Sequence, residues 1–112
     1  MNMSLDIRFR KEKVVLCPHC GERVCNQVER ELSSGGRGWY LILESLGYYV
    51  PWDERTEENY WYAKDMTLTN AQMKDVCAFI RKHEELYEAR EIHDMIASAI
   101  LTDDEIVVNA DW

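Results

Sequence analysis

The chain has 112 residues, of which 46% are apolar, and a formal net charge of −8 at pH 7. Its length predicts one domain, and no apolar run approaches the roughly 20 residues needed to cross a bilayer. Residues 1–38 carry seven Lys/Arg and five Asp/Glu, whereas residues 39–112 carry six and sixteen. A surface as acidic as the second part repels a phosphate backbone and suits a basic protein partner.

The first predicted element is a β-hairpin. Residues 5–10 alternate apolar and charged side chains, the period of two that is typical of a half-buried strand. The charged residues 11–13 form the expected turn, and the β-branched run at residues 14–16 forms a second strand that ends before Cys17.

Three stretches of different character follow this hairpin. Residues 22–32 fit either a strand or a short helix, and periodicity does not decide between them. Residues 33–38, rich in Ser and Gly, are expected to form a loop. The mostly apolar residues 39–46 indicate a short buried helix, with Gly47 as the residue that ends it.

The second half of the chain predicts two longer helices and a final strand. Thr69 and Gln72 match a capping box, and the apolar residues that follow recur at helical spacing. A further helix is expected at residues 89–101, and residues 105–109 indicate a strand. The predicted class is α+β: a small antiparallel sheet, made of the N-terminal hairpin and the C-terminal strand, is packed by about three helices.

The most specific motif is the cysteine turn (residues 17–22, CPHCGE). Cys17 and Cys20 are three residues apart, and Gly21 supplies the positive φ that lets backbone amides point at a thiolate. Thiolates suit structural zinc, which takes four ligands. Cys25 is close enough to act as a third ligand, and the fourth stays open. The other candidates are Cys77, His19, His83, His93 and carboxylates.

The cysteines also allow two roles other than zinc binding, a redox site and disulfides. Cys-x-x-Cys redox sites lie at a helix N-terminus, but Gly21 breaks any helix there and no amphipathic helix follows. Four cysteines also allow two disulfides in a secreted protein, yet the Cys17–Cys20 spacing favours a metal in a reducing compartment. The N-terminus lacks the apolar segment of a signal peptide. The prediction is a cytoplasmic protein.

The acidic pairs do not predict an enzyme. Adjacent carboxylates point to different faces of a helix or strand, whereas catalytic carboxylates converge from separate elements. The glycines of residues 35–38 lack the Lys-Ser/Thr end of a phosphate-binding loop. We therefore expect no catalytic residues, and we interpret the charge runs as solvated faces.

Four segments carry a resemblance to a known group: MSLDI at residues 3–7, the cysteine turn, GGRGWY at residues 35–40 and VVNADW at residues 107–112. Together they resemble small proteins carried by phages and mobile elements of Gram-positive bacteria. Some small, acidic, zinc-binding phage proteins of this size are anti-CRISPR inhibitors. The resemblance implies a protein that acts in the cytoplasm of a host bacterial cell and blocks a Cas nuclease.

These observations lead to two functional hypotheses. In the first, residues 39–112 form an acidic body that binds a basic, nucleic-acid-handling protein such as a Cas effector, and zinc is structural. Its candidate contact residues are Trp52, Asp53, Glu54, Glu57, Glu58, Glu84 and Glu85. In the second, the zinc-knuckle hairpin region (residues 1–38) binds nucleic acid as a zinc ribbon does. Its candidate contact residues are Arg8, Arg10, Lys11, Lys13, Arg23, Arg30 and Arg37.

Overall fold

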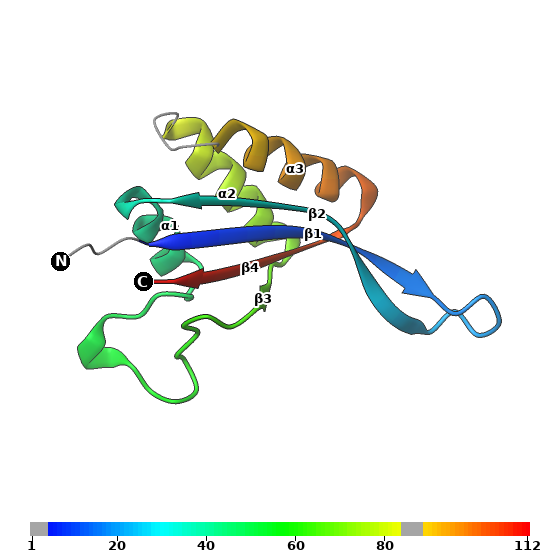
Figure 1. Cartoon of the computed structure of the whole chain (residues 1–112), viewed down its shortest axis with the longest axis horizontal. Coiled ribbons are helices and arrows are strands. Elements are labelled where there is room, and N and C mark those ends of the chain that lie inside the picture. Colours follow the sequence, from blue (N-terminus) through cyan, green and yellow to red (C-terminus); the bar gives the residue numbers. More distant parts are fainter. Residues whose placement is uncertain (1–4, 84–88) are drawn as a thin grey trace.

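A computed structural model describes residues 5–83 and 89–112 of the chain (Figure 1). Its described strands are β1 (Asp6–Leu16), β2 (Arg23–Gly35), β3 (Met66–Thr67) and β4 (Glu105–Asp111). Its described helices are α1 (Tyr40–Ser45), α2 (Asn70–Lys82) and α3 (Ala89–Thr102), with single 3-10 turns η1 (Arg37–Trp39) and η2 (Trp52–Glu54). The predicted α+β class is confirmed.

The four described strands form one antiparallel sheet in the order β2-β1-β4-β3. The N-terminal hairpin and the C-terminal strand therefore pair as predicted, with β1 at the centre. Helices α2 and α3 cover one face of this sheet (Figure 1). Trp39 is fully buried between β1 and α2. Its ring centroid lies 5.6 Å from that of Phe9 on β1 and 6.2 Å from that of Phe79 on α2.

The predicted helix signals are present in the structure. The Thr69 hydroxyl accepts a hydrogen bond from the Gln72 amide at 3.1 Å, and the Gln72 side chain accepts one from the Thr69 amide at 2.9 Å. This capping box satisfies two amides that the first turn of α2 leaves without a helical partner. Gly47 follows α1 with φ +76°, a backbone conformation that favours glycine.

The predicted turn at residues 11–13 is wrong. β1 is one strand from Asp6 to Leu16, with only a shift of its pairing register between Lys11 and Glu12. Of residues 22–32, which the sequence left undecided, all but Glu22 belong to its partner β2. Two of the three charged side chains have partners, and Lys13 is exposed. Lys11 donates to the Ser98 hydroxyl on α3 at 3.0 Å, and Glu12 accepts hydrogen bonds from Arg10 and Asn26, both at 2.9 Å.

The predicted loop at residues 33–38 is also mostly wrong. β2 extends to Gly35, and Ser34 is buried, where its hydroxyl accepts a hydrogen bond from Trp39 Nε1 at 3.0 Å. Only Gly36, with φ +112°, separates β2 from the 3-10 turn at Arg37–Trp39. A buried tryptophan needs an acceptor for its N–H, and Ser34 supplies it.

The distal part of the β1–β2 hairpin extends away from the helices (Figure 1). We call residues 13–28 the hairpin arm; every residue from 18 to 28 is exposed. The arm makes the molecule elongated, with extents of 53 × 33 × 23 Å and a radius of gyration of 14.8 Å, against about 13 Å for a compact chain of this length. In the described part of the chain, no helix is long and apolar enough to cross a membrane.

Candidate metal centre and protein-binding loop

The cysteine turn forms the tip of the hairpin arm. The Cys17 amide donates to the Glu22 carbonyl at 2.7 Å, and the Gly21 amide donates to the Cys17 carbonyl at 2.9 Å. Gly21 has φ +75°, as the sequence predicts. Backbone hydrogen bonds at both ends therefore close a tight turn that carries Cys17 and Cys20 at the far end of the molecule.

The turn favours a thiolate at Cys17. Hydrogen bonding to the backbone of His19, then to the backbone and the side chain of Cys20, lowers the pKa of Cys17 below its ordinary value. Amides that point at a sulfur stabilise its negative charge, which metal binding requires. Two sulfurs in this setting can hold a soft divalent ion.

The described residues do not complete a four-ligand site within one chain. Among residues 5–83 and 89–112, no group of three or more His, Cys, Asp or Glu side chains is placed to hold a metal ion. Cys25 lies on β2 opposite Val15, beyond the turn itself. Cys77 is buried on α2, where burial raises the pKa of its thiol. Zinc, and Cys25 as its third ligand, stay predictions.

The surroundings of Cys20 do not match a thioredoxin-like redox site. Such sites place the cysteines at the N-terminus of a helix, whose amides depress the pKa of the first thiol. Here the chain turns at Gly21 and continues as strand β2 from Arg23. The local backbone at Cys17 and Cys20 is therefore a tight turn that leads into a strand, and no helix begins there.

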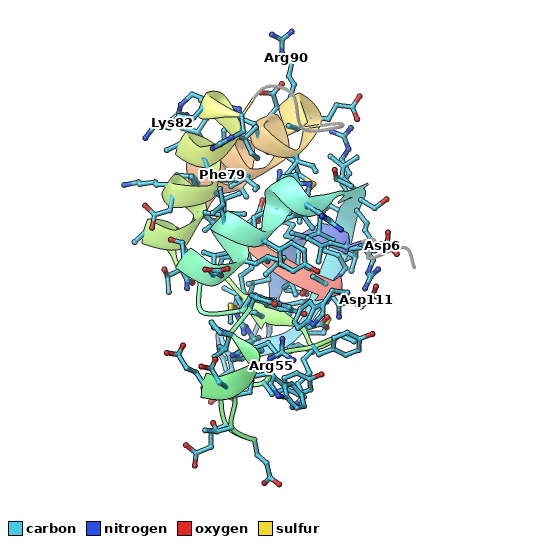
Figure 2. All side chains as sticks on the ribbon, turned by 90° about the vertical axis from the view of Figure 1, so that its left-hand side faces the viewer. Asp6, Arg55, Phe79, Lys82, Arg90 and Asp111 are labelled. Carbon is cyan, nitrogen blue, oxygen red and sulfur yellow. The ribbon has the colours of Figure 1, made fainter. Side chains whose placement is uncertain are left out.

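The second candidate site is the aromatic–acidic loop (residues 49–65), which joins the helix α1 region to β3. Figure 2 shows Arg55 at the opposite end of this view from Arg90, with aromatic side chains beside it. The Arg55 guanidinium lies over four rings, with its carbon 5.3 to 5.7 Å from each centroid, and its Nε donates to the Val50 carbonyl at 2.7 Å. These rings belong to Tyr49, Trp52, Tyr60 and Trp112.

Tyr48 fixes the start of this loop to the sheet. Its ring is buried, and its hydroxyl lies 2.6 Å from the Lys64 carbonyl, 3.1 Å from the Ala110 carbonyl and 2.8 Å from the Ala110 amide. Ala63 also donates to the Ala110 carbonyl, at 2.8 Å. Because β3 has only two residues, Tyr48 and Ala63 together satisfy the part of the β4 edge that β3 leaves uncovered.

The predicted partner-binding residues fall into two groups. Five of them lie together in the aromatic–acidic loop and are all exposed: Trp52, Asp53, Glu54, Glu57 and Glu58. Trp52 keeps 82% of its surface exposed, a large apolar area for a side chain whose neighbours are charged. The other two, Glu84 and Glu85, lie outside the described residues.

Most of the basic residues proposed for nucleic-acid binding already have carboxylate partners. Arg10 pairs with Asp65 at 2.8 Å and with Glu12 at 2.9 Å. Five of the seven candidates form such ion pairs: Arg8 with Asp111, Arg10 with Glu12 and Asp65, Lys11 with Glu29 and Asp104, Arg23 with Glu105, and Arg30 with Glu91. Phosphate binding relies on unneutralised cations, so this pairing disfavours the nucleic-acid hypothesis.

A hollow of about 480 Å³ lies between α2 and α3. It contains His93, whose Nε2 lies 3.0 Å from Arg81 Nη1 and whose Nδ1 lies 3.1 Å from the Asp94 carboxylate. Its described lining is completed by Ile80, Ala89 and Arg90. These residues supply no hydroxyl or thiol nucleophile beside the imidazole, so the described lining does not form a catalytic pair.

Two features of these sites were not predicted. One is the role of Arg55, which is the single cation among the acids of residues 53–58 and is flanked by aromatic segments. That isolation was a usable signal for cation–π contact. The hydroxyl contacts of Tyr48 carried no sequence signal, because they depend on where β3 ends.

Comparisons of the chain with protein-family models, curated proteins and solved structures give no significant match. The cysteine turn and the aromatic–acidic loop are the two features of the chain that bear on its function. The resemblance to phage proteins stays a prediction.

Proposed function

We propose that this chain is a small acidic zinc-binding interaction protein that inhibits a basic, nucleic-acid-handling partner such as a Cas nuclease. It works by binding, and catalysis has no part in it. The carrying observation is the aromatic–acidic loop, where exposed Trp52 lies among four exposed carboxylates. Tryptophan at the centre of a charged rim is the composition that dominates binding energy in protein interfaces.

The loop offers the two chemical groups that a nucleic-acid channel recognises. Residues 53–58 carry four carboxylates and one guanidinium, a local charge of −3. Single-stranded nucleic acid presents negative charges along its backbone and flat rings that stack on protein side chains. Exposed carboxylates beside Trp52, Tyr60 and Tyr62 present a comparable pairing of charge and ring. Competition for such a channel is the inhibitory step.

The loop is ordered before any partner arrives. Arg55 holds the loop rings from within, and Tyr48 and Ala63 attach both of its ends to β4. Thr56 and Asn59 exchange hydrogen bonds across the acidic turn at 2.7 and 3.3 Å. A surface that is already ordered loses less conformational entropy on binding, so more of the contact energy appears as affinity.

The test measures binding to a panel of purified guide-RNA-loaded Cas effectors at low and high salt. The loop variant is D53N/E54Q/E57Q/E58Q. Its control, E22Q/E31Q/D75N/D103N, removes four exposed carboxylates elsewhere and gives the same net charge. We expect the loop variant to lose at least about tenfold in affinity and the control to lose far less, because steering acts locally.

The same panel is assayed for target-DNA binding with and without the chain, and a gel shift tests the chain itself against DNA and RNA. Inhibition that is lost with the loop variant and with W52A fits the proposal. Equal losses for loop and control variants, affinity that is flat with salt, or tight retention of nucleic acid by the chain alone would each contradict it.

A further inference from the structure

The cysteine turn lies where a second molecule reaches it without hindrance. It is the tip of the hairpin arm, on the side of the molecule away from the helices (Figure 1). Cys20 and every other residue from 18 to 28 are exposed. This pair of thiols lies at the end of the arm that is far from the helices (Figure 1).

The tip of the arm offers two side chains that can bind a metal ion. Structural zinc in proteins is almost always bound by four ligands in a tetrahedron. Cys17 and Cys20 come from one short turn whose hydrogen bonds hold them together. No third His, Cys, Asp or Glu joins them in the described part of the chain. Two such turns together carry the four thiolates that a tetrahedral zinc site takes.

The arm behind the tip carries an apolar strip on one face. Successive side chains of a strand alternate between faces, and Glu12 pairs with Val28 while Val14 pairs with Asn26. Alternation along β1 places Leu16 on that face and alternation along β2 places Val24 there, although the pairing shifts register between Val15 and Leu16, so that Leu16 is opposite Arg23. Three of these side chains are more than half exposed: Leu16 (56%), Val24 (65%) and Val28 (52%). These exposed aliphatic side chains share the face with the hydrogen-bonded pair Glu12 and Asn26, and their exposure next to two thiols indicates a surface that another chain covers.

We propose that two copies of this chain join tip to tip and share one zinc ion, each copy contributing the Cys17 and Cys20 thiolates. Zinc displaces the thiol protons on binding, so four thiolates and one Zn²⁺ form the site. The arrangement is a two-fold symmetric contact in which the same patch serves both partners. The apolar strips of the two arms lie beside the shared ion. The inference rests on the zinc-binding part of the proposed function and is independent of the acidic contact surface.

The experiment titrates metal-free protein with zinc chloride under reducing conditions. Native mass spectrometry gives the metal stoichiometry, and light scattering gives the mass in solution. We expect one zinc for two chains and a monomer-to-dimer transition that EDTA reverses. X-ray absorption at the zinc edge should show four sulfurs at about 2.3 Å. The double variant C17S/C20S should bind no zinc and stay monomeric, whereas the matched variants C25S and C77S should behave as the parent chain does.

A variant of the strip separates metal binding from arm contact. L16Q/V24T should keep the four-sulfur spectrum but raise the dimer dissociation constant, by about tenfold if roughly one buried aliphatic side chain is lost from the contact. If this variant dimerised as tightly as the parent chain, the arm would not be part of the dimer interface. EDTA reversal of the parent dimer needs no mutation, so the test does not depend on whether any variant folds.

Three other outcomes would each contradict a different part of the proposal. One zinc per monomer, lost in C25S, would overturn the shared site and leave zinc binding intact. A dimer that EDTA does not dissociate would overturn the role of the metal in joining the arms. Absence of zinc, with a reversible Cys17–Cys20 disulfide, would overturn both the shared site and zinc binding. None of these results bears on the affinity of the aromatic–acidic loop for its partner.

Discussion

Replacing Tyr48 by Phe tests how the aromatic–acidic loop is attached to the sheet. The substitution keeps the buried ring and removes only the hydroxyl that the Ala110 amide and the Lys64 carbonyl contact. Ala110 is itself buried, so its N–H is left without this partner in a place where water does not reach. An unsatisfied buried donor costs about 1–3 kcal/mol. For a domain of this size the melting temperature should fall by about 4–12 °C.

Urea denaturation followed by circular dichroism gives the free energy of unfolding, and amide hydrogen exchange at Ala110 gives the local effect. We expect a lower midpoint with an unchanged slope, and faster exchange at Ala110. The matched control is Tyr60→Phe, because Tyr60 is exposed and its change should stay within about 0.5 kcal/mol. If Y48F matched the parent within that margin, or if Ala110 exchange were unchanged, the hydroxyl would not be the anchor of this loop.

The same variant makes a prediction about alkaline pH. Burial raises the pKa of Tyr48 above its ordinary value of 10 and outweighs the opposing hydrogen bonds to Ala110 and Lys64. The unfolded chain therefore releases this phenol proton first, and stability falls as pH rises above 10, by at most about 1.4 kcal/mol per pH unit. Y48F lacks this contribution, so its stability should change less steeply than the parent's between pH 10 and 12.

Two further predictions concern charges around the loop. Hydrogen bonds from Arg10 and then Asn109 lower the pKa of Asp65 below its ordinary value of 3.8, so the stability it supplies is present above that pH and is lost as pH falls below it. Asp65→Asn should be less stable than the parent at pH 7 and should lose less on acidification to pH 2, measured by urea denaturation. Arg55→Ala should cost about 1–2 kcal/mol and change the fluorescence of Trp52, whereas Arg55→Lys should recover part of the stability because a lysine keeps only the charge. An R55A spectrum and stability equal to the parent's would show that the rings are held without the guanidinium.

The sequence was most informative where the signal is local. The capping box at Thr69 and the positive φ of Gly21 and Gly47 depend on neighbours within a few residues, and all were predicted correctly. The same is true of the apolar spacing in α2 and α3. A local rule gives the right answer when the structure that satisfies it lies within one or two turns of the chain.

The errors arose where partners are distant in sequence. Lys11 lies in an uninterrupted strand because Ser98 and Asp104, far along the chain, contact its amine. Ser34 lies in a strand, where its hydroxyl accepts a hydrogen bond from the indole N–H of buried Trp39. Polar residues of these kinds are typical of turns. Tertiary contacts overrode that tendency, and the sequence alone did not identify those contacts.

The two candidate sites lie at opposite ends of the long axis, the cysteine turn at one end and the aromatic–acidic loop toward the other (Figure 1). Substitutions at sites so far apart should act additively, so a change at the cysteine turn can be measured separately from a change in the loop. If the tips join through zinc, their two-fold symmetry directs the two loops outward, away from the shared ion. A dimer of this shape is bivalent. It gains avidity only against a partner that presents two basic sites within its span, because a second contact adds affinity only where the geometry allows both to form together. If both proposals hold, the metal sets the avidity of the dimer for such a partner, and the loop sets which partner it binds.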